Sequence, residues 1–173
     1  MSNDLGRLIR EIPDFPKPGI LFRDITPLLA DGPGLRRAVE GIAEPFRGKV
    51  DVVLGIESRG FILGAPVALH LGVGLAIVRK PGKLPSETLT ASYELEYGTD
   101  RLEIHADAVS DGHRVLLVDD LLATGGTAGA AVDLVRRLRG DVVACAFLIE
   151  LEALGGRRRL APTAVHALLT YPD

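Results

Sequence analysis

Short runs of consecutive apolar residues alternate along the middle of the chain with segments whose apolar residues recur at helical spacing. The runs are typical of strands buried on both faces of a parallel sheet, and the helical spacing indicates amphipathic helices. The runs predict strands over 51–56, 73–78, 114–118 and 142–149. The helical spacing predicts helices over 61–71 and 127–138. Strands that alternate with helices predict an α/β fold with a mostly parallel, twisted sheet flanked by helices.

A β-hairpin is predicted between the second and third of these strands. Residues 91–96 and 101–104 favour extended structure, and they flank the segment Tyr97-Gly98-Thr99-Asp100. Two strand segments separated by a short Gly-containing turn are typical of a hairpin.

The first fifty residues follow a different pattern. Residues 4–12 are compatible with a short helix, which a proline-rich loop beginning at Pro13 ends. Residues 35–46 have the spacing of a second amphipathic helix. The chain has no internal repeat and no linker long enough to divide it. We therefore expect a single domain over residues 1–173, in which 1–34 form an N-terminal elaboration.

Composition narrows the class of protein. The chain has 173 residues, 47% of them hydrophobic, with 20 Lys and Arg against 23 Asp and Glu and a net charge of −3. A chain this apolar and this weakly charged is not expected to be disordered. A binder that holds nucleic acid mainly by electrostatics would carry a positive balance, so we expect no nucleic-acid partner.

The cysteine count and the hydropathy along the chain exclude further classes. Cys145 is the single cysteine, which excludes a disulfide scaffold and a zinc site built from several cysteines. No apolar run approaches the roughly 20 residues that a membrane-spanning helix needs, and the N-terminus does not have the pattern of a signal peptide. We expect a cytoplasmic protein with no membrane partner.

The strongest chemical signal is the segment 115–127, Val-Leu-Leu-Val-Asp-Asp-Leu-Leu-Ala-Thr-Gly-Gly-Thr. An apolar strand ends there in Asp119 and Asp120, at the carboxyl edge where open α/β sheets bind ligands. Residues 124–127 then open a helix, whose free N–H groups and dipole favour a phosphate. Two glycines allow the backbone to aim successive N–H groups at one point. The acidic pair suits sugar hydroxyls or water on a bound Mg²⁺.

Other readings of this segment are weaker. The two aspartates could be solvated, with 124–127 acting only as a helix cap, but the order of strand, acidic pair and Gly-rich turn favours a binding site. The chain has neither the Gly-x-x-x-x-Gly-Lys-Ser/Thr of a P-loop nor a Gly-x-Gly-x-x-Gly after a strand. It also lacks the paired-histidine spacing of a transition-metal site, so we expect no protein cage for a metal.

Segment 115–127 resembles the phosphoribosyl pyrophosphate (PRPP) motif of the type I phosphoribosyltransferases. Four further segments, in the family's order, are similar to its adenine-specific members. These segments are Phe15–Pro27, Gly55–Phe61, Arg79–Pro85 and Tyr93–Gly98. The resemblance runs from about residue 8 to about residue 160, so chance is a poor explanation.

The resemblance implies a fold and a reaction. The fold is the type I phosphoribosyltransferase fold, with a mobile hairpin loop and with 1–34 as a base-binding hood. The enzymes of this family are pentosyltransferases of purine salvage that convert adenine and PRPP to AMP and pyrophosphate with Mg²⁺, and they form homodimers. The transition state is oxocarbenium-like, so catalysis depends mainly on positioning and on charge stabilisation.

The resemblance also implies roles for residues that bind PRPP. The 5′-phosphate would be held by Ala123, Thr124, Gly125, Gly126 and Thr127. The ribose hydroxyls would meet Asp119 and Asp120, near which Mg²⁺ carried by PRPP would lie. Pyrophosphate would be met by Glu57, Ser58, Arg59, Arg79, Lys80 and Lys83. Arg59 is also assigned a catalytic role, and the family can hold a non-proline cis peptide at Glu57–Ser58, which we expect only where the site requires it.

Adenine would bind the N-terminal elaboration. Phe22 offers an aromatic face for the purine, and the main chain of Leu21 and Arg23 would read its hydrogen-bonding edge. In the hairpin, Glu96 is the candidate for proton handling at the purine and Tyr97 belongs to the flexible loop. From the residues alone, Phe22 could also be a core residue and Glu96 a solvated carboxylate. Arg59 could be half of a surface ion pair, but its place after a strand favours a functional role.

Two alternative functions stay open. The same PRPP chemistry could act on another base, such as guanine, xanthine or orotate. A non-catalytic PRPP-sensing regulator is the alternative from a different class, but it would need a nucleic-acid-binding appendage or a basic face.

Overall fold

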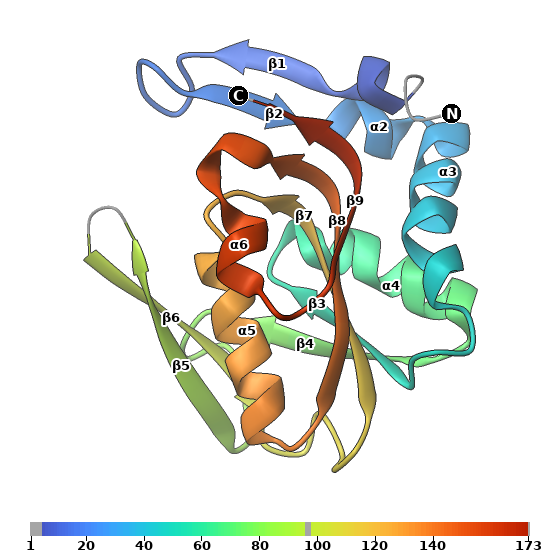
Figure 1. Cartoon of the computed structure of the whole chain (residues 1–173), viewed down its shortest axis with the longest axis vertical. Helices are drawn as coiled ribbons and strands as arrows, with labels where there is room; N and C mark the ends of the chain where they lie inside the picture. Colours follow the sequence, from blue (N-terminus) through green and yellow to red (C-terminus); the bar gives the residue numbers. More distant parts are fainter. Residues whose placement is uncertain (1–4, 96–97, 173) are drawn as a thin grey trace.

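A seven-stranded sheet forms the centre of the molecule (Figure 1). The computed structural model describes residues 5–95 and 98–172. The strand order is β5-β6-β4-β3-β7-β8-β9. The strands are β3 (Val52–Ile56), β4 (Gly74–Arg79), β5 (Thr88–Leu95), β6 (Gly98–His105), β7 (Arg114–Leu122), β8 (Asp141–Leu151) and β9 (Val165–Tyr171).

The sheet is mostly parallel, as the apolar runs predict. Strand β3 pairs in parallel with β4 and β7, and β7–β8 and β8–β9 are also parallel. All five residues of β3 are buried, because helices cover both faces of the sheet at this position. The hairpin β5–β6 is antiparallel and joins the sheet through β4. The predicted α/β architecture and the hairpin are therefore confirmed.

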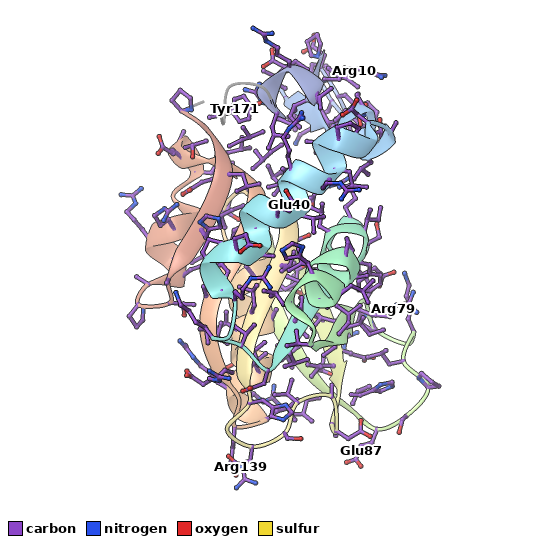
Figure 2. All side chains as sticks on the ribbon, turned by 90° about the vertical axis from the view of Figure 1, so that its right-hand side faces the viewer. Arg10, Glu40, Arg79, Glu87, Arg139 and Tyr171 are labelled. Carbon is purple, nitrogen blue, oxygen red and sulfur yellow. The ribbon has the colours of Figure 1, made fainter. Side chains whose placement is uncertain are left out.

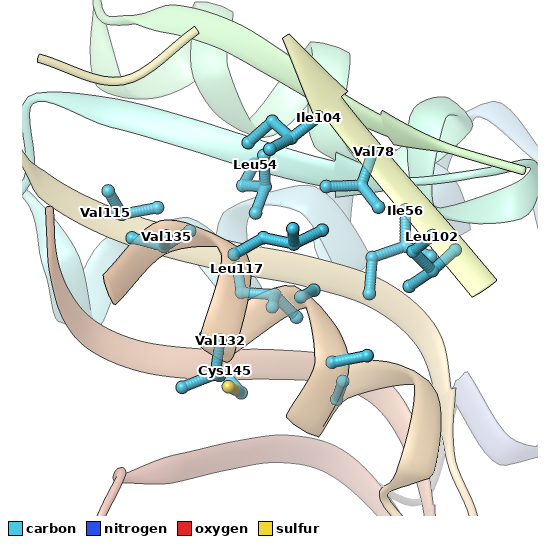
Figure 3. Packing of buried hydrophobic residues seen from close by; sticks show 14 of the residues in the cluster. Leu54, Ile56, Val78, Leu102, Ile104, Val115, Leu117, Val132, Val135 and Cys145 are labelled. Atoms are coloured by element: carbon cyan, nitrogen blue, oxygen red, sulfur yellow. The ribbon is translucent and has the colours of Figure 1, made fainter. Parts of the chain in front are cut away.

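Helices divide the core into two layers. Helix α5 (Gly126–Arg137) covers one face, and α3 (Gly32–Ala43) and α4 (Arg59–Leu71) cover the other (Figure 1). Side chains of the central strands alternate between the layers: Leu117 packs with Val132 of α5 (Figure 3), and its neighbour Leu116 packs on the opposite side.

Several boundaries differ from the sequence prediction. The helix predicted over 4–12 is wrong: β1 (Arg10–Pro13) follows a short 3₁₀ turn, η1 (Gly6–Leu8). The stretch 10–13 pairs antiparallel with β2 (Leu21–Asp24), and this long-range pairing overrides local helix preference. Strand β7 continues to Leu122, so the acidic pair lies within the strand and not beyond its end.

The remaining elements are short. Sequence reasoning did not predict α2 (Thr26–Ala30), α6 (Gly156–Leu160) or β9. Two single 3₁₀ turns complete the chain, η2 (Glu44–Phe46) and η3 (Glu152–Leu154). None of the helices described is both long enough and apolar enough to cross a membrane.

The small β1–β2 sheet lies across the end of the molecule where β9 finishes (Figure 1). Because β9 runs parallel to β8 and β7, this is the carboxyl edge of the parallel strands. The fold thus brings the N-terminal segment to the edge at which the acidic pair and the Gly-rich turn were expected.

Candidate active site

A cavity of about 360 Å³ lies at the carboxyl edge of β3, β4 and β7. It joins segments that lie up to seventy residues apart in the chain. The lining residues are Glu57, Ser58, Arg59, Lys80, Tyr93, Leu102, Asp119, Asp120, Leu121, Ala123 and Thr127. Eight of these residues were candidates from the sequence: Glu57, Ser58, Arg59, Lys80, Asp119, Asp120, Ala123 and Thr127.

The turn after β3 supplies one wall of the cavity. The peptide bond between Glu57 and Ser58 is cis, as the resemblance allowed. Arg59 then opens α4, and its Nε donates a hydrogen bond of 2.5 Å to Oδ2 of Asp120. Asp120 is buried whereas the Arg59 side chain is 45% exposed, so the guanidinium remains accessible from the cavity.

Asp119 lies against the first turn of α4. A Cβ atom added to Gly60 would come within 2.9 Å of Asp119 Oδ1, so the carboxylate depends on a glycine at this position. The same oxygen accepts a 2.9 Å hydrogen bond from the backbone N–H of Asp120. Burial, together with the negative charge of Asp120, raises the pKa of Asp119 well above its ordinary value.

Glu57 organises the cations at the other wall. It accepts hydrogen bonds from Lys83 Nζ (2.5 Å), Arg79 Nη2 (3.3 Å) and the backbone N–H of Lys80 (2.9 Å). Burial acts to raise the pKa of Glu57, but the bonds from Lys83, Lys80 and Arg79 outweigh it and lower this pKa to about 2. Glu57 is therefore ionised, and Arg79 and Lys83 are bound to it beside the cavity.

Lys80 turns its side chain into the cavity. Its ammonium pairs with Asp100 of β6 and donates a 2.9 Å hydrogen bond to the Tyr93 hydroxyl, which in turn donates to Asp100 at 3.1 Å. Burial acts to lower the pKa of Lys80, but the contacts with Asp100 and Tyr93 raise it overall. Sequence reasoning missed Tyr93 and Asp100 as site residues. The register of the β5–β6 hairpin places these two residues directly opposite each other, so a prediction of that register would have paired them.

The Gly-rich turn forms a second, smaller cavity. It measures about 80 Å³ and is lined by Asp119 and residues 121–128. Gly125 has a φ of +81° and precedes the first residue of α5, so the N–H groups of the first helical turn border the cavity. A turn of this shape before a helix is compatible with the phosphate cradle that the sequence predicts.

Gly156 of α6 packs directly on the cradle, and sequence reasoning missed it. A Cβ atom on Gly156 would clash with the carbonyl oxygen of Ala123 and come within 2.7 Å of Leu122 Cδ1. A Cβ atom on Gly125 would in turn meet the Gly156 carbonyl oxygen at 2.9 Å. The contact has no signal in the local sequence, because it joins segments thirty residues apart.

None of the three candidate base-binding residues lines the 360 Å³ cavity, but Phe22 lies near Arg59, which does. The Phe22 ring centroid is 5.8 Å from the guanidinium carbon of Arg59, and the ring packs edge-to-face on Phe15 at 5.1 Å. Leu21 is 38% exposed. The Arg23 side chain is buried and contacts Glu11 and the Tyr171 ring. Glu96 and Tyr97, the two candidates from the hairpin loop, lie outside the described residues.

A larger cavity, about 480 Å³, lies between the hairpin and α5. Its charged lining residues are Glu94, Asp133 and Arg159, two anions and one cation. We assign the chemistry to the 360 Å³ cavity because that cavity has the acidic pair, the cations and the edge of the cradle.

Comparison with known proteins defines the family. A sequence profile of the phosphoribosyl transferase domain matches residues 28–165. The adenine phosphoribosyltransferase of Geobacter metallireducens is 56% identical over 170 residues, which cover 98% of this chain and 99% of that protein. The chain belongs to the adenine phosphoribosyltransferase family.

Solved structures of family members have the same fold. The adenine phosphoribosyltransferase of Thermoanaerobacter pseudethanolicus superposes with a TM-score of 0.96 at 52% identity, covering 99% of this chain and 100% of that one. The Saccharomyces cerevisiae enzyme, crystallised with an imino-altritol bisphosphate and adenine, gives 0.92 at 40% identity, covering 97% and 98%. The expectation of a type I phosphoribosyltransferase fold is therefore confirmed.

Proposed function

We propose that this protein transfers the 5-phosphoribosyl group of PRPP to adenine, giving AMP and pyrophosphate in purine salvage. The observation that carries the proposal is the 360 Å³ cavity, which brings an acidic pair, two cations and the edge of a phosphate cradle around one space. Family members more than 50% identical to the chain carry the name of this activity.

The cradle would bind the 5′-phosphate. Backbone N–H groups of 123–127 border the 80 Å³ cavity, and Thr124 and Thr127 add hydroxyl donors. The positive end of the α5 dipole supplies attraction that needs no lysine. Gly125 and Gly126 would serve by letting the backbone approach the phosphate closely.

Arg59 and Lys80 would bind the pyrophosphate group. Arg59 presents a planar, permanently charged fork, and Lys80 supplies a second charge across the same cavity. As the bond to the anomeric carbon breaks, negative charge collects on the departing pyrophosphate, and these cations stabilise it. Ser58, in the turn between β3 and α4, would also contact the pyrophosphate. Arg79 and Lys83 would act at a greater distance, held in place by Glu57.

Asp119 and Asp120 would bind the ribose hydroxyls. Their oxygens also fit Mg²⁺, a hard cation that prefers oxygen ligands and keeps several waters. Within residues 5–95 and 98–172 no three Asp, Glu, His or Cys side chains form a metal-binding group. We propose that the Mg²⁺ is carried mainly by PRPP. The ion would neutralise phosphate charge when bound.

Adenine would stack on Phe22 beside Arg59. Main-chain groups at Leu21 and Arg23 would accept from the 6-amino group and donate to N1, which favours adenine over a 6-oxopurine. Glu96 would handle the proton at the purine ring, and Tyr97 would belong to the loop that closes the site. We infer that residues 1–34 serve as the base-binding hood within a single domain of 1–173.

The assay that tests the proposal supplies PRPP and Mg²⁺ with adenine, guanine, hypoxanthine, xanthine or orotate, and counts nucleotide and pyrophosphate together. We expect AMP from adenine and little product from the other bases. Turnover of another base would retain the PRPP site and reject the base assignment. Binding of PRPP without turnover of any base would favour the regulatory alternative.

The assembly and location are also proposals. We infer a homodimer in the cytoplasm. Support for a homodimer comes from Ile62 and Leu69 of α4 and Leu75 of β4, large apolar side chains that are 47%, 82% and 39% exposed.

A further inference from the structure

Arg23 is one of the few charged residues with a buried side chain. Its side chain is only 4% exposed although it lies in a two-stranded sheet at the surface. The guanidinium carbon lies 3.8 Å from the centroid of the Tyr171 ring, and Nη1 pairs with the Glu11 carboxylate. Burial of a guanidinium is costly unless partners compensate its charge and its N–H groups, and Glu11 and Tyr171 are two such partners.

These contacts connect two distant parts of the chain. Glu11 is the cross-strand partner of Arg23 in the β1–β2 sheet, and Tyr171 is the last residue of β9. Figure 1 shows β2 beside the end of β9, and Figure 2 places Tyr171 and Arg10 at the same end of the molecule. An isolated two-stranded sheet is marginally stable in water, so it depends on such anchors.

Side-chain alternation gives Phe22 and Arg23 different partners. Phe22 lies near Arg59 at the cavity, whereas Arg23 contacts the end of the central sheet. The Arg23 side chain is therefore held outside the cavity, while its main chain lies in the strand that we propose reads the purine.

We propose that Arg23 is a positioning residue for purine binding. Its guanidinium, which contacts the Tyr171 ring and Glu11, fixes the main chain of 21–23 in the strand that brings Phe22 near Arg59, so its side chain sets purine affinity without touching the purine. The inference rests on the proposed function, because it assumes that the main chain of 21–23 binds the base. The guanidinium plane stacks on an aromatic face in a way that the Lys ammonium does not reproduce.

The test compares steady-state constants of Arg23→Met, Arg23→Lys and Tyr171→Ala with those of wild type. We expect each to raise KM for adenine by about tenfold or more, because the main chain of 21–23 would no longer be preorganised to bind the base. KM for PRPP should stay within about twofold, since the cradle and Arg59 are untouched. Tyr171→Phe keeps the ring beside the Arg23 guanidinium, so we expect it to raise KM for adenine less than Tyr171→Ala does.

Arg10→Met is the matched control. Arg10 pairs with Asp24 at 3.7 Å across the same two strands, but its side chain is 62% exposed. We expect wild-type constants from this variant. Equal effects of Arg10→Met and Arg23→Met, or a parallel rise of both KM values, would overturn the proposal because they would indicate general weakening of the hairpin.

A second readout does not depend on the base. Amide hydrogen exchange in 21–24 should accelerate in Arg23→Met and Tyr171→Ala while exchange in β3 stays unchanged. Unchanged exchange in 21–24 would reject the positioning role even if wild type used a base other than adenine. AMP formation by wild type, with adenine KM unchanged in Arg23→Met, would reject the positioning role and leave the proposed function intact.

Discussion

Asp119 and Asp120 are neighbours in β7 with different surroundings. Asp120 faces a cation, because Arg59 Nε donates to it at 2.5 Å. Asp119 is enclosed by Gly60 and lies beside the charge of Asp120, and its pKa is raised as a result. An ionised carboxylate that is buried beside another negative charge destabilises the folded state. Carboxylates with such raised pKa values are common at functional sites.

The raised pKa of Asp119 should make the free energy of unfolding depend on pH. A carboxyl whose pKa is higher in the folded state costs stability once it ionises, so the cost is full above the folded pKa and vanishes below the unfolded value of 3.8. Asp119→Asn should therefore raise Tm at pH 7, by about 2–4 °C for each kcal/mol of relief. The gain should disappear as the pH falls toward 4.

Thermal unfolding of both proteins between pH 4 and pH 8 makes this measurement. Asp120→Asn is the control: it removes a carboxylate that has a cation partner, so no gain at pH 7 is expected. A Tm difference between wild type and Asp119→Asn that does not change with pH would contradict the assignment of a raised pKa.

The second prediction at this scale concerns Arg59. Arg59→Lys retains the charge but loses the planar fork that contacts Asp120 and lies near Phe22. We expect kcat/KM for PRPP to fall by about 10²-fold, the typical effect of removing one preorganised donor to developing charge. Arg114→Lys, which alters an exposed pair with Asp51, should leave catalysis unchanged. Equal kcat/KM in Arg59→Lys and wild type would remove Arg59 from the reaction.

At the scale of elements, contact between α6 and the phosphate cradle is the feature that decides the shape of the site. The cradle itself follows from local sequence, since strand, acidic pair and glycines are consecutive. Its exact placement depends on Gly156, where backbone of α6 approaches Ala123 and Gly125 too closely for any side chain. A helix with no catalytic group therefore fixes where the 5′-phosphate would bind.

Gly156→Ala tests this dependence. The added methyl group must displace the Ala123 carbonyl or α6, so we expect KM for PRPP to rise by about tenfold, equivalent to about 1.4 kcal/mol of lost binding. KM for adenine should change less. Gly32→Ala is a matched control because nothing lies within 4 Å of its added Cβ. Steady-state kinetics on the two variants decides the matter, and equal PRPP constants would show that the cradle tolerates movement of α6.

The same elements show how far the sequence predicts the structure. The central strands were predictable because each is a continuous apolar run, and the cradle and the 57–59 turn because their residues are adjacent in the chain. β1, β9 and α6 were missed because they are defined by strand pairing or by packing against distant segments, and not by a pattern in their own sequence. Tyr93 and Asp100 enter the site only through the register of the hairpin, which periodicity does not specify.

At the scale of the whole molecule, helix α4 connects the site to the surface. Its first residue is Arg59, and its side chains Ile62 and Leu69 are exposed, as is Leu75 of β4. Residues 62 and 69 are two turns apart and share one face of the helix. Large apolar side chains exposed on one face of a helix are compatible with an interaction surface. We expect this face to join the two copies of the proposed homodimer.

Leu69→Glu should therefore shift the protein toward monomer. The introduced carboxylate would be buried without a partner in a dimer, at a cost of several kcal/mol. Sedimentation velocity at several micromolar concentrations measures the mass, and Leu154→Glu, which alters a 48% exposed leucine of η3, should leave it at the wild-type value. If Leu69→Glu kept the wild-type mass, α4 would lie outside the interface. If the variant became a monomer and also lost turnover, the result would indicate that the dimer is needed for activity. Helix α4 would then connect the interface to the site, because its first residue is Arg59.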